Sequence, residues 1–189
     1  MKTLPKLLRL TLFGIAVTSL VCVQPAQAFT VTIGRVGSNV VATGSGAINL
    51  TGLNFDGSGQ SVGNGIQANA AVIFMSPGLA NTDSYTGFTG PTSFGSGVSF
   101  ENNSFSGDFF GIFGSGPGPL LILPRGYVSG AALSNSMTFD NATLASLGLT
   151  PGTYVWSWGT GLPNQNFTLI IYRYNPTLFA LEHNSGASA

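Results

Sequence analysis

Residues 138–172, TFDNATLASLGLTPGTYVWSWGTGLPNQNFTLIIY, decide the predicted fold of this chain. From Tyr154 to Trp158 large aromatic residues alternate with smaller ones, and this two-residue period is typical of a β-strand. The segment Phe167–Tyr172 is rich in β-branched and aromatic residues, which predicts a second strand. Because a short polar loop separates the two segments, we expect them to pair as a β-hairpin.

A short helix is expected just before this hairpin, over Asn141–Leu147. The Asn141 side chain can accept a hydrogen bond from the free amide of Leu144 and so begin the helix. Gly148 can adopt the left-handed conformation that commonly ends a helix. Pro151-Gly152 then predicts a tight turn, since proline presets φ and glycine tolerates a positive φ.

The rest of the chain shows strand patterns separated by turn residues. Gly44-Ser45-Gly46 is expected to form a hairpin turn, Asp56–Gly65 a glycine-rich loop, and residues 81–107 a run of short strands and turns. Further strands are predicted over Phe29–Arg35, Val40–Thr43, Ala47–Thr51, Ala70–Met75, Phe109–Phe113, Leu120–Leu123 and Tyr127–Phe139. About nine to eleven closely spaced strands predict an all-β fold, an antiparallel, jelly-roll-like β-sandwich forming a single domain over residues 29–172.

The first 28 residues have the three parts of a secretory signal peptide. Three basic residues precede an apolar stretch, Leu10–Val23, that is too short to span a bilayer comfortably. Ala26-Gln27-Ala28 matches a cleavage site, so we expect cleavage after Ala28 and a secreted or cell-surface location. At the other end of the chain, residues 173–189 are expected to fray.

Composition excludes several kinds of chemistry. The single cysteine, Cys22, lies in the signal segment, so the mature chain has no thiol for a disulfide, a nucleophile or a metal ligand. Charged residues make up 6% of the chain, against about a quarter in ordinary soluble proteins. After cleavage three arginines face six acidic residues, a net charge of −3, so neither nucleic acid nor an anionic membrane is an expected partner.

Two patterns that could carry catalysis are weak. Gly59–Gly63 (GQSVG) matches the G-x-S-x-G nucleophile motif. That motif needs a preceding strand and a histidine base, and the only histidine is His183 near the C-terminus. Glu101 and Asp108 could form the carboxylate pair of a glycosidase, but nothing in the sequence places them across a cleft. No catalytic residue is therefore predicted, and the chain is not expected to be an enzyme.

A metal or cofactor site is not expected either. Side-chain oxygens at Asn54, Asp56 and Asn64 lie around the predicted glycine loop, and such oxygens can bind Ca²⁺. Their spacing matches neither an EF-hand nor a glycine-rich calcium repeat, so solvated loop residues are the favoured interpretation.

Tyr154, Trp156 and Trp158 share one face of their predicted strand. An exposed face of this kind would let the rings stack on sugars, as in a carbohydrate-binding module. A buried face would place the same rings in the core, which the large apolar area of aromatic side chains favours. Both alternatives remain open at this point.

Four stretches carry a resemblance to a known group of proteins. They are Asn39–Gly57 (NVVATGSGAINLTGLNFDG), Phe88–Gly97 (FTGPTSFGSG), Gly126–Thr143 (GYVSGAALSNSMTFDNAT) and Phe139–Gly159 (FDNATLASLGLTPGTYVWSWG). Together they resemble secreted bacterial proteins that often carry a PEP-CTERM sorting tail. The resemblance implies export to the cell surface or matrix and no particular biochemical activity.

The end of the chain departs from that group. Residues Arg173–Ala189 contain no Pro-Glu-Pro, no long apolar helix and no basic cluster at the end. Sorting through such a tail is therefore not expected here. The leading hypothesis is an exported, non-enzymatic cell-surface or matrix protein that acts by surface or self-association, with envelope or matrix polysaccharide or itself as partner. The alternative is a carbohydrate-binding module that uses an exposed aromatic strand face.

Overall fold

The computed structural model describes residues 27–98, 100–115 and 118–173. The predicted signal segment, apart from Gln27 and Ala28, lies outside these residues, as does the predicted frayed tail after Arg173. No helix within the described ranges is long and apolar enough to cross a membrane.

Twelve strands and one short 3₁₀ helix, η1 (Ala68–Ala70), form within these ranges. The strands are β1 (Thr30–Val36), β2 (Asn39–Ala47), β3 (Asn54–Ser61), β4 (Gly65–Gln67), β5 (Val72–Met75), β6 (Ala80–Thr86), β7 (Ser104–Gly107), β8 (Phe110–Phe113), β9 (Leu120–Pro124), β10 (Ala132–Phe139), β11 (Gly152–Ser157) and β12 (Asn166–Ile171). The apolar and alternating runs near the positions of β1, β5, β8 and β9 correctly predicted these strands.

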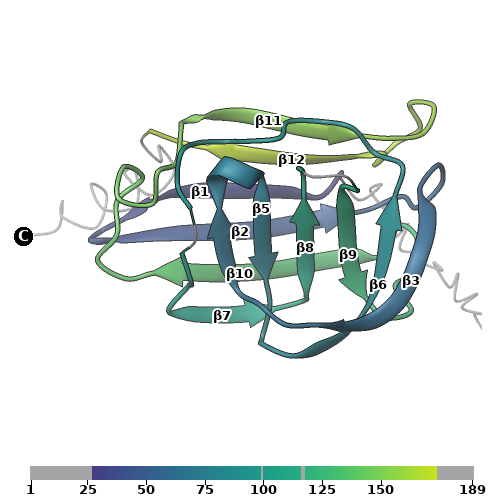
Figure 1. The fold of residues 1–189 in the computed structure, drawn as a ribbon, viewed down its shortest axis with the longest axis horizontal. Coiled ribbons are helices and arrows are strands. Elements are labelled where there is room, and N and C mark those ends of the chain that lie inside the picture. The colour runs from purple at the N-terminus through teal and green to yellow at the C-terminus, as the bar shows by residue number, and fades with distance from the viewer. Residues whose placement is uncertain (1–26, 99, 116–117, 174–189) are drawn as a thin grey trace, which may run out of the picture.

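The strands build two six-stranded sheets that pack face to face (Figure 1). The first sheet has the order β11-β12-β1-β2-β10-β7, and the second has the order β3-β6-β9-β8-β5-β4. The predicted all-β sandwich is therefore confirmed. The predicted hairpin is confirmed too, since β11 pairs antiparallel with β12 from Gly152↔Ile171 to Ser157↔Asn166.

One ladder differs from the antiparallel prediction. β1 and β12, close to the two ends of the described chain, pair in parallel in the middle of the first sheet, from Thr30↔Thr168 to Ile33↔Ile171. Every other ladder between the described strands is antiparallel. Short connections favour antiparallel neighbours, whereas strands far apart in sequence can meet in either direction.

The inner faces of the two sheets meet in a core centred on aromatic rings. The Phe29 and Phe110 ring centroids lie 4.6 Å apart, and those of Phe110 and Phe167 lie 4.8 Å apart. The ring of Trp156 stacks on that of Phe167 at 5.1 Å. Phe110 belongs to the second sheet, whereas Trp156 and Phe167 belong to the first and Phe29 directly precedes β1. The contacts of Phe110 therefore join the two layers. Ring pairs of this kind add to the free energy of apolar burial.

The helix predicted over Asn141–Leu147 is a single hydrogen-bonded turn instead. Asn141 has a φ of 51°, so it lies in the left-handed region and does not cap a helix. The turn begins at Thr143, whose Oγ1 accepts the Ser146 amide at 3.0 Å while Ser146 Oγ accepts the Thr143 amide at 2.8 Å. It ends at Gly148, which has the predicted left-handed conformation with a φ of 62°. The start thus lies two residues later than predicted, which leaves room for one turn only.

The turn predicted at residues 44–46 is also wrong, because β2 continues through these glycines to Ala47. β2 pairs on one side with β1 and on the other with β10, so hydrogen bonds from both neighbours hold it extended. The chain reverses earlier, at Gly37-Ser38, where Gly37 has a φ of 59°. A side chain at Gly44 would collide with the Phe29 ring and the Asn135 amide, so this glycine makes room for core packing.

Candidate functional site

The aromatic face of β11 lies in the core. Trp156 is fully buried and Trp158 is 6% exposed, while Tyr154 is half-buried. The indole nitrogens are satisfied inside the protein, since Trp156 Nε1 donates to the Pro91 carbonyl at 2.9 Å and Trp158 Nε1 donates to the Asn49 carbonyl at 2.7 Å. The prediction that Tyr154, Trp156 and Trp158 form an exposed face for sugar stacking is therefore wrong for the two tryptophans, and only Tyr154 keeps partial exposure.

A loop segment covers the open side of β11 and explains this burial. Thr89 and Ser157 exchange two backbone hydrogen bonds, of 3.0 and 2.9 Å, which fix residues 88–94 beside the strand. Gly90 then lies directly against Trp156, with no room for a Cβ atom. The approach of this segment is a long-range contact, which strand periodicity cannot reveal.

The residues considered for catalysis do not come together. Ser61, the serine of the GQSVG motif, is the last residue of a strand, and its hydroxyl lies 2.8 Å from that of Thr82. The ranges that the structure describes contain no histidine, because His183 lies outside them. Asp108 Oδ2 accepts the Ser134 amide at 2.8 Å. A groove of about 210 Å³ beside Glu101 has no second carboxylate among its described lining residues.

The residues considered for calcium are divided between a strand and a loop. Asn54 and Asp56 lie on β3 in exposed positions, and Asn64 follows in the connection to β4. No group of three or more His, Cys, Asp or Glu side chains that could hold a metal ion occurs in the described part of the chain.

The segment predicted as a glycine-rich loop, Asp56–Gly65, mostly forms the edge strand β3. β3 pairs antiparallel with β6 from Asn54↔Thr86 to Ser61↔Ala80, with a bulge between Phe55 and Gly57. Glycine, serine and aspartate have low β-propensity, so local sequence favours a loop here. The ladder with β6 overrides that preference by supplying backbone partners along the whole strand.

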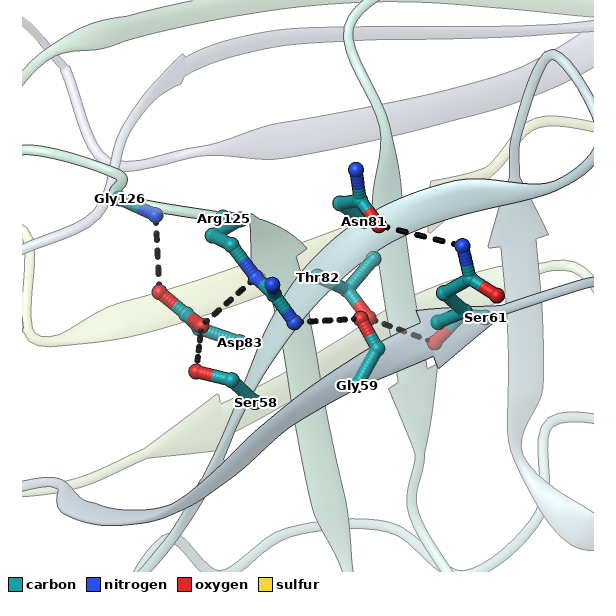
Figure 2. Close-up of polar contacts among 9 residues, drawn as sticks. Ser58, Gly59, Ser61, Asn81, Thr82, Asp83, Arg125 and Gly126 are labelled. Atoms are coloured by element: carbon teal, nitrogen blue, oxygen red, sulfur yellow. Dashed lines mark hydrogen bonds and ion pairs between the residues drawn. The ribbon is translucent and has the colours of Figure 1, made fainter.

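Side chains also hold β3 against β6 (Figure 2). Ser58 Oγ donates to Asp83 Oδ1 at 2.5 Å, and Ser61 and Thr82 share the hydroxyl contact described above. A third pair links Gln60 Nε2 to Asn81 Oδ1 at 3.3 Å. These polar pairs add to one aromatic cross-strand contact, between the rings of Phe55 and Tyr85, whose centroids lie 5.8 Å apart.

Asp83 is the centre of this polar network (Figure 2). It is 7% exposed, and its second oxygen accepts the Gly126 amide at 2.8 Å. Arg125 Nε lies 3.9 Å from Oδ1, and Arg125 Nη2 donates to the Gly59 carbonyl at 2.9 Å. The network thus ties the end of β9 to both β6 and β3.

The same contacts set the ionisation of Asp83. The hydrogen bond from Ser58, followed by that from the Gly126 amide, holds the Asp83 pKa below its ordinary value, and Arg125 adds to this effect while burial opposes it. Burial, followed by the negative charge of Asp83, raises the pKa of Tyr85. Asp83 is therefore ionised at neutral pH, and its role here is to hold β3 in place.

The outer side of β3 differs from the other sheet edges. β4 has three residues and exchanges hydrogen bonds with Phe100, β7 has four residues, and β11 is covered by residues 88–94. β3 has eight residues, pairs within the described chain only with β6, and contains neither lysine nor proline. Long, uncovered edges with few charges are the ones that pair with further strands.

Exposed apolar side chains lie at both ends of this strand. Phe55 is 61% exposed near its start. Val62, 75% exposed, follows Ser61, and Leu79, 66% exposed, precedes Ala80. Ser61 and Ala80 are register partners, so both apolar side chains lie at the same end of the β3–β6 ladder. We call the surface formed by residues 54–62 together with Leu79 the β3 edge.

The β3 edge offers backbone donors and acceptors, small polar side chains and three exposed apolar side chains. Comparisons with protein-family models, with curated proteins and with solved structures find no match to this chain.

Proposed function

We propose that this chain is an exported, non-enzymatic protein of the cell surface or extracellular matrix that works by self-association through the β3 edge. The single observation that carries the proposal is the length and openness of β3 in the second sheet. The signal-like N-terminus and the low charge of the chain support export and association.

A second copy of the chain is the partner that the β3 edge fits best. An unpaired strand edge is complementary to another strand, and two identical strands can pair antiparallel about a two-fold axis. Four of the eight residues of β3 are small, glycine at positions 57 and 59 and serine at 58 and 61, so this half of the strand does not block the approach of a second copy.

The expected strength of one such contact is low. Each backbone hydrogen bond contributes about 0.5–1.5 kcal/mol. Association costs about 4–15 kcal/mol in lost translational and rotational freedom. A few edge bonds and three apolar side chains therefore give weak pairing, which becomes effective where the chain is concentrated on a surface or in a matrix.

A lysine on the edge strand tests the proposal. A Cβ atom at Gly57 meets nothing within 4 Å, so Gly57→Lys places a charge on β3 without disturbing its packing. Gly118→Lys is the matched control, because its Cβ is equally free and it lies in the connection between β8 and β9. Sedimentation velocity over a wide range of protein concentrations should show association of the wild type and the control, and loss of association in Gly57→Lys.

Two results would contradict this function. A wild-type protein that stays monomeric up to millimolar concentration would remove self-association. Equal association of Gly57→Lys and the wild type would place the contact elsewhere on the molecule. Export is tested separately, by N-terminal sequencing of the chain recovered outside the cell, which should begin at Phe29.

A further inference from the structure

A groove of about 380 Å³ at one end of the first sheet contains two arginines, Arg35 and Arg173. Leu144, Leu149 and Pro151 form its apolar wall, and Thr143 completes this side. Two of the three arginines expected in the mature chain thus line one groove. The third, Arg125, lies in the network around Asp83 on the second sheet.

The parallel pairing of β1 and β12 brings the two arginines together. Ile33 and Ile171 are register partners, and the Tyr172 amide donates to the Ile33 carbonyl at 2.9 Å, so the pairing extends past β12. Arg35 and Arg173 each follow their isoleucine by two residues. Arg35 lies near the end of β1 and Arg173 just past the end of β12, and both are exposed and line the same groove.

Neither arginine has a carboxylate partner within residues 27–98, 100–115 and 118–173. The ion pair between Arg125 and Asp83 is the one found there. Arg35 Nε donates to the Gly37 carbonyl at 3.1 Å, which is a neutral acceptor. None of the acidic residues that the structure describes lines the groove. The two positive charges in this groove repel each other, and a bound anion would relieve that repulsion.

The groove combines this charge with an apolar wall. Leu149 is 6% exposed and Leu144 packs against the core, so the wall is anchored. Guanidinium groups recognise planar oxyanions through paired N–H donors. Carbohydrate rings present C–H faces that pack on apolar side chains. We propose that this groove binds the carboxylate of a uronic-acid unit of an acidic polysaccharide, with the sugar ring against Leu144, Leu149 and Pro151.

This site is separate from the β3 edge and goes beyond self-association. The groove belongs to the first sheet, next to the turn between β1 and β2 at the left of Figure 1, whereas β3 lies at the right. Loss of ligand binding and loss of self-association can therefore be measured independently, because the variants that test them lie in different sheets.

Isothermal titration calorimetry of the purified protein with oligogalacturonate tests the site. Arg35→Gln and Arg173→Gln should each weaken binding about tenfold, the loss expected for one charge-assisted contact. The double variant should show no measurable binding, and Arg35→Lys with Arg173→Lys should be intermediate because charge remains while the forked donors are lost. Gly118→Asp, which changes the net charge equally at an open and remote position, should bind like the wild type.

Ligand controls distinguish the possible outcomes. Maltohexaose, which has no carboxylate, should not bind, and sodium sulfate should bind more weakly than oligogalacturonate. Equal affinity for sulfate would show a simple anion site and overturn the proposed sugar contact. Absence of oligogalacturonate binding to the wild type, or equal weakening by Gly118→Asp, would overturn the site itself. Emission from the buried tryptophans, unchanged in each variant, confirms that the fold is intact.

Discussion

β11 and β3 are both edge strands, one in each sheet, but they are stabilised in different ways. β11 buries Trp156 and Trp158 in the core and is covered on its open side through the hydrogen bonds between Thr89 and Ser157. β3 buries little, and its ladder with β6 is supported by polar contacts around Asp83. The outer side of β11 is covered by residues 88–94, whereas the outer side of β3 has no strand partner among the residues that the structure describes.

An edge strand can be covered and anchored in the core, as β11 is, or it can leave its outer backbone available to another strand, as we propose for β3. Burial of large side chains stabilises β11 strongly but leaves no surface for a partner. Polar pairing stabilises β3 on its β6 side, and no other described strand pairs with it.

Removal of the Trp156 side chain should have the largest effect. Trp156 is fully buried, stacks on Phe167 and donates to the Pro91 carbonyl, so Trp156→Ala leaves a cavity and an unpaired acceptor. The free energy of unfolding should fall by about 3–5 kcal/mol. Chemical denaturation of the variant measures it. Val155→Ala, on the same strand but 45% exposed, is the control and should change stability little. A small effect of Trp156→Ala would mean that the core collapses around the missing ring.

Asp83→Asn should weaken β3 more than it weakens the whole fold. Asparagine keeps the shape of Asp83 but loses the charge that strengthens the hydrogen bonds from Ser58 and the Gly126 amide. The loss should be about 1–2 kcal/mol. Hydrogen exchange should quicken at the β3 amides and stay unchanged in β12. Asp56→Asn, which changes an exposed carboxylate on β3 itself, is the control. Uniform acceleration across both sheets would argue against a local role for Asp83.

The stability of β3 should depend on pH in the acid range. The Asp83 pKa is lowered in the folded protein from its ordinary value of 3.8, so its contribution is fully present above that pH. The contribution should disappear as the pH falls through the lower, folded-state value. Protection of the β3 amides, measured by hydrogen exchange between pH 5 and pH 2, should follow this course in the wild type. In Asp83→Asn this pH-dependent loss of β3 amide protection should be absent. If the loss persists in the variant, another carboxylate causes it.

Val62→Ser should have the smallest effect on folding and a measurable one on association. Val62 is 75% exposed, so the free energy of unfolding should change by less than about 0.5 kcal/mol. Sedimentation should show weaker self-association, since Val62 is part of the β3 edge. Val128→Ser, at a side chain that is 71% exposed and outside that edge, should associate like the wild type. Equal behaviour of the two variants would remove Val62 from the contact.

Local patterns were sufficient where side chains and structure agree. The alternation in β11, the β-branched run in β12 and the left-handed glycine at position 148 all predicted what the structure shows. The same reasoning failed at Gly44 and over β3. Local sequence interprets glycine as a turn residue. Gly44 instead makes room for Phe29 and Asn135, and Gly57 and Gly59 lie in the edge strand β3, which pairs with β6.

The two-residue alternation of apolar side chains predicts a β-sandwich, because such side chains are buried when the inner faces of two sheets pack together. Long-range packing, in contrast, determines that β11 is covered and that β3 has no second strand partner among the described residues. The cover over Trp156 comes from residues 88–94, more than sixty positions away, and β3 depends on β6 and on Arg125. Contacts between residues so far apart in sequence depend on the packing of the whole chain, and the periodicity of neighbouring residues does not predict them.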